Sequence, residues 1–422
     1  MKILFIVMGI LSLFSSCSGK KEKQQEKEKL YSWYPSESAP YLYPTTIHVG
    51  YFGMPDKSTV YIPSKSLVGN VWGVGQSLHV VGEKYKPLPE AIEIVWLSFT
   101  ENKFYYVSDW LPKKRLQSLF DMVWLNVRKI EKRYNGLVVG MAPYGMIQIW
   151  AVGDGRRTEV CCLHGPEVPV KMSEFRPHAI ISQDEYVKST IEDEPDIYEN
   201  LKKNGLPDSS LFENYRKRFN YHIVPKIEME DVELTKTAVH YFNGEYDVVL
   251  WERLKENLYS LQARPRNIYI SWTAGKDQYE VRFVFDERMI LSAFEKVFGS
   301  DYPQRDDFEV VELYDKLYGE GKLPKGDFTI HISSEGKPTG ASLKTEKGEI
   351  SIPTDKMQIL VIKNDNLIYK SSNYNERDWW GEGGNLAASK IRNLECPNYE
   401  ICLIDYGCGK FNRKIHIMEQ YP

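Results

Sequence analysis

The sequence predicts an α+β fold in which antiparallel β-sheets pack against helices, with two similar halves that derive from an internal duplication. Three observations predict this fold. Aromatic residues make up 13% of the chain, with 28 tyrosines and 10 tryptophans, a composition typical of strand-rich proteins. Short runs of alternating apolar and polar residues are separated by turn-forming residues. A hairpin followed by a helix occurs in both halves.

A secretory signal precedes the folded part. Lys2 is followed by an apolar stretch at 3–14, which is too short to cross a hydrocarbon core of roughly 30 Å as a helix. The tetrapeptide FSSC (14–17) resembles the bacterial lipobox, which implies cleavage before Cys17 and a diacylglyceryl group on its sulfur. We therefore predict an acylated (palmitate-bearing) lipoprotein, and Ser18 after the cysteine resembles the outer-membrane class. An ordinary secreted protein with a free Cys17 is the alternative.

The domain organisation follows from this signal. Residues 1–16 are the expected signal peptide and 17–30 a flexible tether, because 20–29 contain five lysines, three glutamates and two glutamines and no apolar residue. A first β-rich α+β domain is expected at 31–222 and a second, related one at 223–422. The tether places the folded body on one side of the outer membrane, facing the periplasm or the cell surface.

The elements of the first half follow one another in a regular order. A strand at 47–52 and its partner at 58–64 precede a glycine-rich loop at 71–83. The alternating runs AIEIVWLSF and KFYYVSDWL form a hairpin around residues 100–102. The remaining expected elements are a helix from Pro112 through residue 134, a second hairpin at 137–153, a strand at 156–165, and polar helices within 183–219, one of them between Pro195 and Gly205.

The second half repeats this order. Residues 265–298 follow the pattern of 89–123, so that Trp272 takes the place of Trp96 and Tyr279 that of Tyr105. The later hairpin around Gly336 resembles the one around Gly145. A tandem copy explains these matches, although any two domains built from a hairpin, a helix and a second hairpin share some of them.

Charge and motifs exclude several classes of function. Cleavage after residue 16 removes Lys2 from the 54 basic and 58 acidic residues, which leaves a formal net charge of −5. No nucleic-acid partner is expected at this charge. The chain lacks a GxSxG elbow, an HExxH pair and a Walker loop, and its glycine-rich segments are not dinucleotide fingerprints. We expect no cofactor, and the absences favour a binding protein over an enzyme.

The cysteines predict no metal site. Besides Cys17 there are five, and an odd number in an oxidising compartment leaves at least one thiol unpaired. The last three recur every six residues, which suits either a disulfide between two of them or buried free thiols better than zinc. We expect the adjacent pair beside His164 to pack at a strand end. The five cysteines are Cys161, Cys162, Cys396, Cys402 and Cys408.

Two loops contain candidate ligand-binding residues. Trp72 and His79 lie in or beside the glycine-rich loop, where a histidine could bind a ligand or act as a base. Trp379 and Trp380 lie in the charged segment NERDWWGEGGN, and tryptophan beside carboxylates often stacks on sugars or grips a partner protein. The alternatives are a loop histidine bonded to backbone and tryptophans that plug the end of a β-core.

Several of these segments together resemble a known family. YSWYPSESAPYLYP (31–44), the loop that begins WGVGQSLHVVGE at Trp72, the hairpin VVGMAPYGMIQIWAVG and the following RRTEV are similar to bacterial lipoproteins grouped as domain-of-unknown-function family 2931. The resemblance covers about 31–220. It implies a β-rich protein of the cell envelope without known enzymology, and it gives no catalytic residues. Some relatives are thought to lie near toxin-delivery genes.

The leading hypothesis is therefore a lipid-anchored module that binds a glycan or a protein. The anchor, the aromatic loops and the missing catalytic motifs support it. An immunity lipoprotein against a periplasmic toxin is the first alternative. The second is a hydrolase whose residues meet only in the folded chain, and it requires a pocket that joins His79 to a carboxylate.

Overall fold

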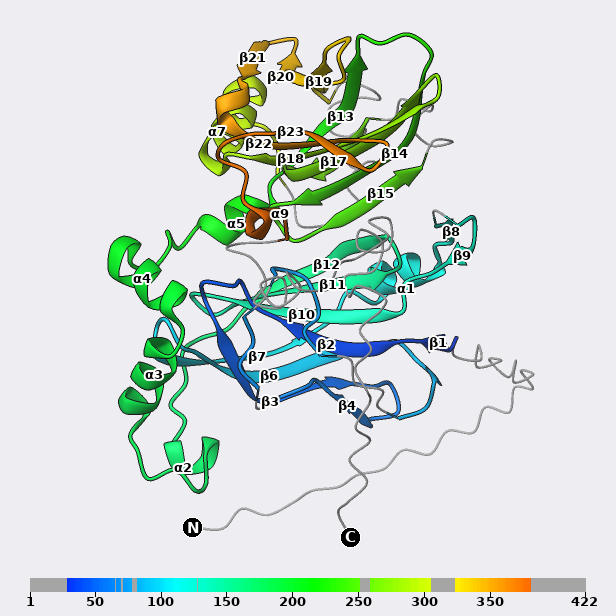
Figure 1. Cartoon of the computed structure of the whole chain (residues 1–422). Helices are drawn as coiled ribbons and strands as arrows, with labels where there is room; N and C mark the ends of the chain where they lie inside the picture. The colour runs from blue at the N-terminus through cyan, green and yellow to red at the C-terminus, as the bar shows by residue number, and fades with distance from the viewer. Residues whose placement is uncertain are drawn as a thin grey trace, which may run out of the picture.

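The structure is a computed structural model that describes residues 29–380, apart from 65, 70, 78–81, 127, 251–258 and 305–322. Mostly antiparallel and mixed sheets with few helices make up these residues, which confirms the predicted class at this level. Figure 1 shows two lobes, one of blue to cyan strands and one of green to orange strands. No helix in the described part of the chain combines the length and the apolar character needed to cross a membrane.

The first lobe consists of two sheets that enclose one core. One sheet has the order β4-β3-β6-β7, and the other side is formed by β2-β10-β11-β12, in which β2 and β10 are parallel. Their inward side chains, with three from helix α1, form a continuous apolar cluster. The strands are β2 (Tyr34–Ser38), β3 (Thr45–Gly53), β4 (Thr59–Tyr61), β6 (Ala91–Ser98), β7 (Lys103–Trp110), β10 (Gly136–Ala142), β11 (Met146–Gly153) and β12 (Arg156–His164).

One predicted helix is much shorter than expected. Helix α1 spans Lys113–Asp121 and does not continue to residue 134, because Met122 adopts an extended conformation. Trp124 belongs instead to β8 (Trp124–Leu125), which pairs with β9 (Glu131–Lys132), and its indole nitrogen donates to the carbonyl of Asp154 at 2.8 Å. The helical spacing of apolar residues continues past Phe120, but Trp124 and Leu125 form a strand instead.

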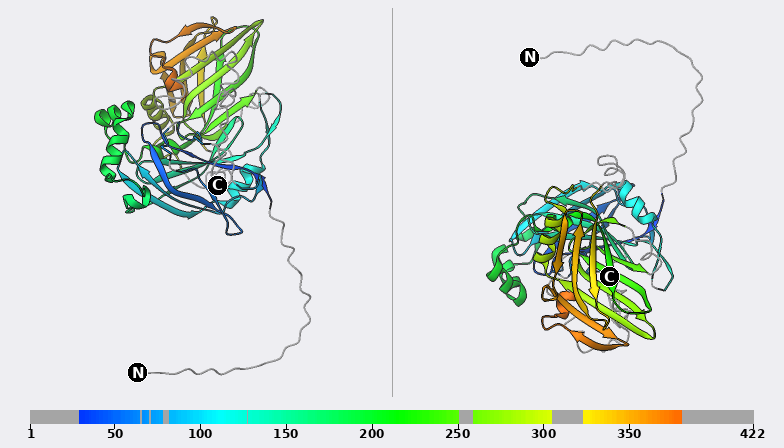
Figure 2. Two further views of the ribbon diagram at one scale, coloured as in Figure 1. Left: turned by 60° about the horizontal axis from the view of Figure 1, so that its bottom comes forward. Right: turned by 90° about the horizontal axis from the view of Figure 1, so that it is seen from above.

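The polar segment after β12 is helical, as predicted. Its helices are α2 (Met172–Phe175), α3 (Gln183–Glu192), α4 (Pro195–Asn204) and α5 (Leu211–Arg216). Pro195 begins α4, and Gly205 ends it with a positive φ of 69°. Helices α2, α3 and α4 lie along one side of the first lobe (Figures 1 and 2), whereas α5 lies where the two lobes meet.

The second lobe has the same strand order as the first. One of its sheets includes β15-β14-β17-β18, and the other includes β13-β19-β20-β21, in which β13 and β19 are parallel. Both sheets share a core with helix α7 (Glu287–Phe298). The strands are β13 (Arg218–Ile227), β14 (Val232–Tyr241), β15 (Tyr246–Leu250), β16 (Ser260–Ala263), β17 (Pro265–Ala274), β18 (Asp277–Phe285), β19 (Gly326–Ile332), β20 (Pro338–Thr345), β21 (Gly348–Ile352), β22 (Met357–Lys363) and β23 (Asn366–Lys370).

Equivalent side chains occupy equivalent places in the two lobes. Trp96 lies opposite Tyr105 in the β6–β7 pair, as Trp272 lies opposite Tyr279 in the β17–β18 pair. A turn glycine packs on each tyrosine ring: a Cβ on Gly145 would lie 2.8 Å from Tyr105. A Cβ on Gly336 would lie 2.7 Å from Tyr279, and both glycines have positive φ angles, 73° and 77°. Larger residues are excluded at both positions.

Strands β10 and β11 form the layer between the lobes. All seven residues of β10 and the first six of β11 are buried, which is the pattern of strands covered on both faces. One face contacts the core of the first lobe and the other contacts Phe212, Tyr215 and Phe242 at the junction. Among the described residues, the lobes also share a ten-stranded sheet, in which two residue pairs between β12 and β15 connect the two lobes. The predicted boundary at 222/223 falls within β13.

Candidate functional site

Of the residues predicted to bind a ligand, the two whose side chains the structure describes, Trp72 and Trp379, do not meet at one site. Cys17 and His79 lie outside the described residues, as does the side chain of Trp380. Trp72 and Trp379 are 2% and 1% exposed and belong to separate clusters of buried residues. Neither of these two rings presents an open face to a ligand.

Trp72 fills the junction between the lobes. Its ring meets Trp150 edge to face at a centroid distance of 4.8 Å and lies 5.3 Å from Phe212. Gly140 makes room for both tryptophans, since a Cβ there would lie 2.4 Å from Trp150 and 2.7 Å from Trp72. The glycine-rich loop therefore delivers a large aromatic side chain into the packing between lobes.

Trp379 anchors the short helix α9 (Glu376–Trp380) to the sheet of the second lobe. Its ring packs with Tyr246 and Tyr269, and the Arg282 guanidinium lies 5.3 Å from the ring centroid. The side-chain amide of Asn267 donates to the Trp379 carbonyl at 2.6 Å. Trp379 thus fills the end of a β-core, and its burial holds the rest of α9 in place.

A pocket of about 360 Å³ opens beside α5 and α9. One wall is aromatic: Tyr215 stacks on Phe242 at 5.4 Å, and Phe212 meets Tyr43 edge to face at 6.0 Å. Both Phe212 and Tyr215 come from α5, and Tyr43 comes from the proline-rich segment that precedes β3. The pocket is lined by Leu42, Tyr43, Leu211, Phe212, Tyr215, Phe242, Arg266, Val284, Phe285, Glu287, Gln358 and Asp378.

Another part of the pocket lining, the polar wall, consists of polar and charged side chains. The Gln358 amide donates to a carboxylate oxygen of Asp378 at 2.5 Å, and Arg266 donates to the Asp378 carbonyl at 3.3 Å. Arg266, Gln358 and Asp378 are half-buried, and Glu287 is exposed at the start of α7. The pocket therefore offers an aromatic surface in one part and a guanidinium, an amide and carboxylates in another.

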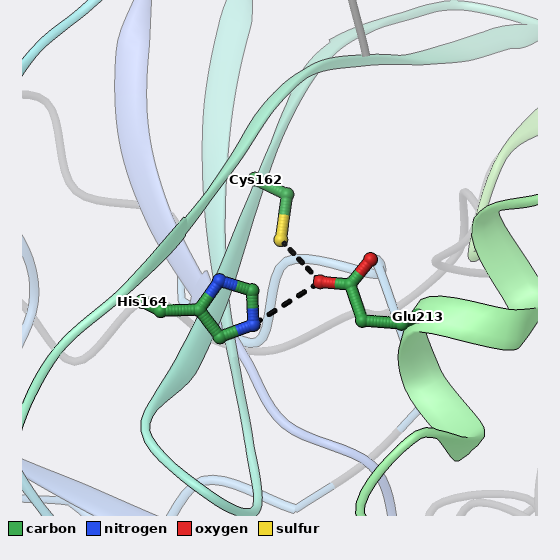
Figure 3. A group of neighbouring side chains, drawn as sticks. All are labelled: Cys162, His164 and Glu213. Carbon is green, nitrogen blue, oxygen red and sulfur yellow. Dashed lines mark hydrogen bonds and ion pairs between the residues drawn. The ribbon is translucent and has the colours of Figure 1, made fainter. Parts of the chain in front are cut away.

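A second cluster brings together three side chains that can bind a metal ion. Cys162 and His164 on β12 meet Glu213 on α5, with all three ligand atoms within 4.8 Å of one another (Figure 3). His164 Nε2 lies 3.1 Å from Glu213 Oε1, and the Cys162 thiol donates to the same oxygen at 3.5 Å. The hydrogen bond from His164 lowers the pKa of Glu213 to about 2, whereas burial raises the pKa of Cys162.

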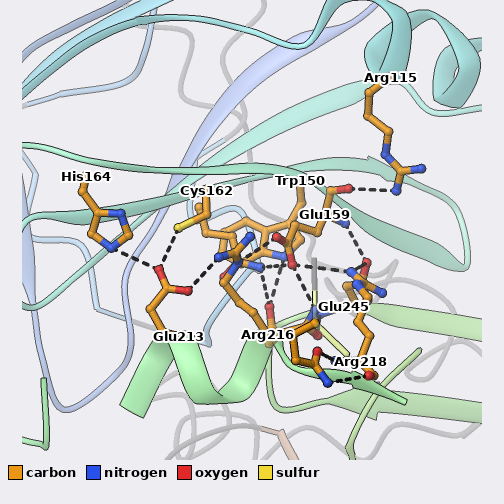
Figure 4. Close-up of polar contacts among 12 residues, drawn as sticks. Arg115, Trp150, Glu159, Cys162, His164, Glu213, Arg216, Arg218 and Glu245 are labelled. Carbon is orange, nitrogen blue, oxygen red and sulfur yellow. Dashed lines mark hydrogen bonds and ion pairs between the residues drawn. The ribbon is translucent and has the colours of Figure 1, made fainter. Parts of the chain in front are cut away.

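Behind this cluster lies a buried network of two carboxylates and two guanidinium groups (Figure 4). Glu159 on β12, whose side chain is 1% exposed, accepts from Arg216 Nε at 2.8 Å and lies 3.4 Å from Arg218 Nη2. Arg218 also pairs with Glu245 at 2.8 Å. The side-chain amide of Gln148 also donates a hydrogen bond to Glu159 Oε2 at 2.9 Å. The network joins β12, α5, β13 and the turn between β14 and β15.

The charges in the network stabilise one another. Burial alone would raise the pKa of Glu245, but the neighbouring Arg218 outweighs it and the pKa is lowered. Likewise, burial acts to lower the pKa of Arg218, and the carboxylates of Glu245 and Glu159 reverse this and raise it. Glu245 and Arg218 therefore favour their charged forms in the folded protein, and each depends on its partners for compensation.

The sequence missed most of these residues. It named Cys161, Cys162 and His164 but assigned them a packing role, and both cysteines are free thiols in the structure. Alternation along a strand places Cys162 and His164 on one face, and this signal could have paired them. Nothing in the sequence indicated Glu213, which is 51 residues from Cys162. The predicted disulfide candidates Cys396, Cys402 and Cys408 lie outside the described residues.

Comparison with known proteins gives a family for the amino-terminal part. Residues 19–207 match the family described as "Protein of unknown function (DUF2931)", so the predicted resemblance is confirmed over this range. No curated protein and no solved structure matches the chain. The matched range includes Leu42, Tyr43, Cys162 and His164, whereas α5 and the second lobe lie beyond it. The pocket and the cysteine cluster are thus completed by residues outside the family domain.

Proposed function

We propose that this protein is a lipoprotein of the outer membrane whose folded body binds a glycan in the pocket beside α5 and α9. The observation that carries this proposal is the division of the pocket into an aromatic wall and a polar wall. Sugars present apolar ring faces that stack on aromatic side chains and hydroxyl groups that bond to carboxylates, amides and guanidinium groups.

The size of the pocket also supports a small ligand. Its volume of about 360 Å³ lies at the lower end of the range typical of small-molecule sites. A half-buried Tyr43 contributes ring surface at the rim, and Arg266 and Asp378 are held in place by hydrogen bonds before any ligand arrives. Such preorganisation reduces the entropy lost on binding.

The anchor places this pocket outside the cytoplasm. Two or more acyl chains on Cys17 hold a protein stably, since each buried CH₂ contributes about 0.8 kcal/mol. The first described residue, Lys29, pairs with Asp121 of the first lobe at 2.5 Å, which marks where the tether reaches the folded body. The body then faces either the periplasm or the cell surface.

The anchor can be tested directly. In cells fed radiolabelled palmitate, the wild-type chain should take up label and co-sediment with outer membranes. Replacement Cys17→Ser should abolish both, because serine offers no sulfur for the diacylglyceryl group. A wild-type protein that is unlabelled and keeps residues 1–16 would refute the anchor, whatever the pocket binds.

Glycan binding is tested on the full chain purified in detergent. On an array of bacterial envelope glycans, the wild-type protein should bind a defined subset, and Arg266→Gln should weaken that binding at least tenfold, because the guanidinium is lost from the polar wall. Arg288→Gln is the matched control, since Arg288 is exposed on α7 but does not line the pocket.

Two outcomes would refute the glycan proposal. One is the absence of any bound glycan, and the other is binding that Arg266→Gln and Arg288→Gln reduce equally. Capture of a secreted toxin by the wild-type chain but not by Arg266→Gln would replace a glycan with a protein, as the immunity alternative requires.

We also propose that the two lobes arose by duplication of one sandwich. The repeated strand order, the two parallel pairs and the matched tryptophan, tyrosine and glycine positions support this proposal. Helix α7 follows β18 as α1 follows β7. The family matches only the first copy, which is consistent with a second copy that has diverged to supply most of the pocket.

A further inference from the structure

We propose that Cys162, His164 and Glu213 form a binding site for a divalent transition-metal ion, with Zn²⁺ as the expected occupant. The sequence led us to expect no metal, and the structure departs from that expectation by adding a carboxylate from a distant helix. The site is separate from the pocket, so neither proposal depends on the other.

The fold brings the three ligands to one point from two elements. Cys162 and His164 are two residues apart on β12, so their side chains project from the same face of the strand. Glu213 lies in α5 and reaches toward both of them (Figure 3). The ligands therefore span the junction between the first lobe and the segment that leads to the second.

Two of the three separations between the ligand atoms fit tetrahedral coordination. Zinc bonds of about 2.0–2.1 Å to nitrogen and oxygen and about 2.3 Å to sulfur place two ligand atoms about 3.3–3.6 Å apart. The distance from His164 Nε2 to Glu213 Oε1 is 3.1 Å, and that from Cys162 Sγ to the same oxygen is 3.5 Å. The third pair, the Cys162 sulfur and a ring nitrogen of His164, lies within 4.8 Å, and a side-chain rotation that brings this pair to about 3.6 Å completes a tetrahedral set.

The donor set and its exposure define the class of ion and site. One thiolate, one imidazole and one carboxylate suit Zn²⁺ or Co²⁺ and disfavour Mg²⁺ and Ca²⁺, which prefer oxygen ligands. The side chains of His164 and Glu213 are 54% and 39% exposed, so a fourth position is accessible to water or a small ligand. Three protein ligands with one open position is the arrangement of reactive rather than purely structural zinc sites.

Binding of the metal ion at this site requires no further reactant. On binding, Cys162 releases its thiol proton to solvent, and the His164 ring binds the ion through Nε2 and keeps a proton on Nδ1. Glu213 then binds through Oε1, because Arg216 Nη1 holds Oε2 at 2.7 Å. Arg216 is a positioning residue, and Glu159 compensates its charge at 2.8 Å.

The test uses Co²⁺ as a spectroscopic probe on the reduced, chelator-treated full chain. The wild-type protein should bind one equivalent and develop a thiolate-to-cobalt charge-transfer band that added Zn²⁺ removes. Cys162→Ser should abolish the band, and His164→Gln should weaken binding at least tenfold. His164 is more than half exposed, so its replacement tests the site without threatening the fold.

Two controls make the assignment specific. Cys161→Ser is matched to Cys162→Ser, because Cys161 is its neighbour on β12 and projects to the opposite face. It should keep the band. A variant with Cys396, Cys402 and Cys408 replaced by serine should also keep it. The absence of a band in the wild type, or its survival in Cys162→Ser or at full strength in His164→Gln, would overturn the proposal.

Discussion

Replacement of Glu159 by alanine is expected to lower the free energy of unfolding by about 3–5 kcal/mol, because it removes the buried carboxylate that two buried guanidinium groups share. Glu159 is 1% exposed and lies within 3.4 Å of guanidinium nitrogens of both Arg216 and Arg218. Those arginine side chains are only 8% and 16% exposed, so water cannot replace the lost carboxylate without opening the junction between the lobes.

Chemical denaturation monitored by tryptophan fluorescence measures this loss, since Trp72 and Trp150 lie at the same junction. Glu167→Ala is the control: Glu167 pairs with Lys103 at 2.8 Å, but both side chains are about half exposed. Such a surface pair contributes less than about 1 kcal/mol. Equal losses for Glu159→Ala and Glu167→Ala would show that the buried network does not hold the lobes together.

The sequence predicted the strands well because their signal is local. The alternation in β6 and β7 and the turn residues between them determine a hairpin without reference to the rest of the chain. The matched order of hairpin and helix was also visible, since Trp96 lies 17 residues and Trp272 15 residues before the start of the following helix. The extent of α1 was not predicted, because Trp124 fits helical spacing and yet packs in a small β-hairpin.

The candidate sites were not predictable in the same way, because each is assembled across the junction. Trp72 and Trp379 were identified as candidate ligand-binding residues in loops, with packing in a core as the alternative, and loop tryptophans can also fill space between lobes. Which role applies depends on what covers the loop, and here β11 and α5 cover Trp72. Glu159 and Glu213 are two of 58 acidic residues, and nothing in their neighbours marks one as buried and the other as a possible ligand.

Glu37 is expected to contribute stability that is lost as pH rises from about 4.5 to about 7. This residue on β2 is 1% exposed. Its Oε1 accepts from the Ser77 hydroxyl at 2.5 Å, whereas Oε2 has no hydrogen-bond partner among the described residues. Burial raises the pKa of Glu37 from 4.5 to about 7. The folded state therefore holds the proton more tightly than the unfolded chain does.

The direction of the pH effect follows from the difference in Glu37 pKa between the folded and the unfolded state. Below pH 4.5 the carboxyl is protonated in both states and burial carries no charge penalty. As pH rises through 7, Glu37 loses its proton in the folded protein and becomes a buried carboxylate. The folded state then loses the stability that it gained from binding this proton more tightly than the unfolded chain does. A shift of this size corresponds to about 3 kcal/mol, at about 1.4 kcal/mol per pKa unit.

Glu37→Gln tests this expectation because the amide has the same shape and no charge. At pH 8 the variant should be more stable than the wild type by about 2–3 kcal/mol, and at pH 4.5 the two should be equal, as measured by denaturation at each pH. Ser77→Ala should move the wild-type transition to higher pH, because the Ser77 hydroxyl acts to lower the Glu37 pKa. A stability difference that is constant from pH 4.5 to pH 8 would mean that Glu37 is charged throughout this range.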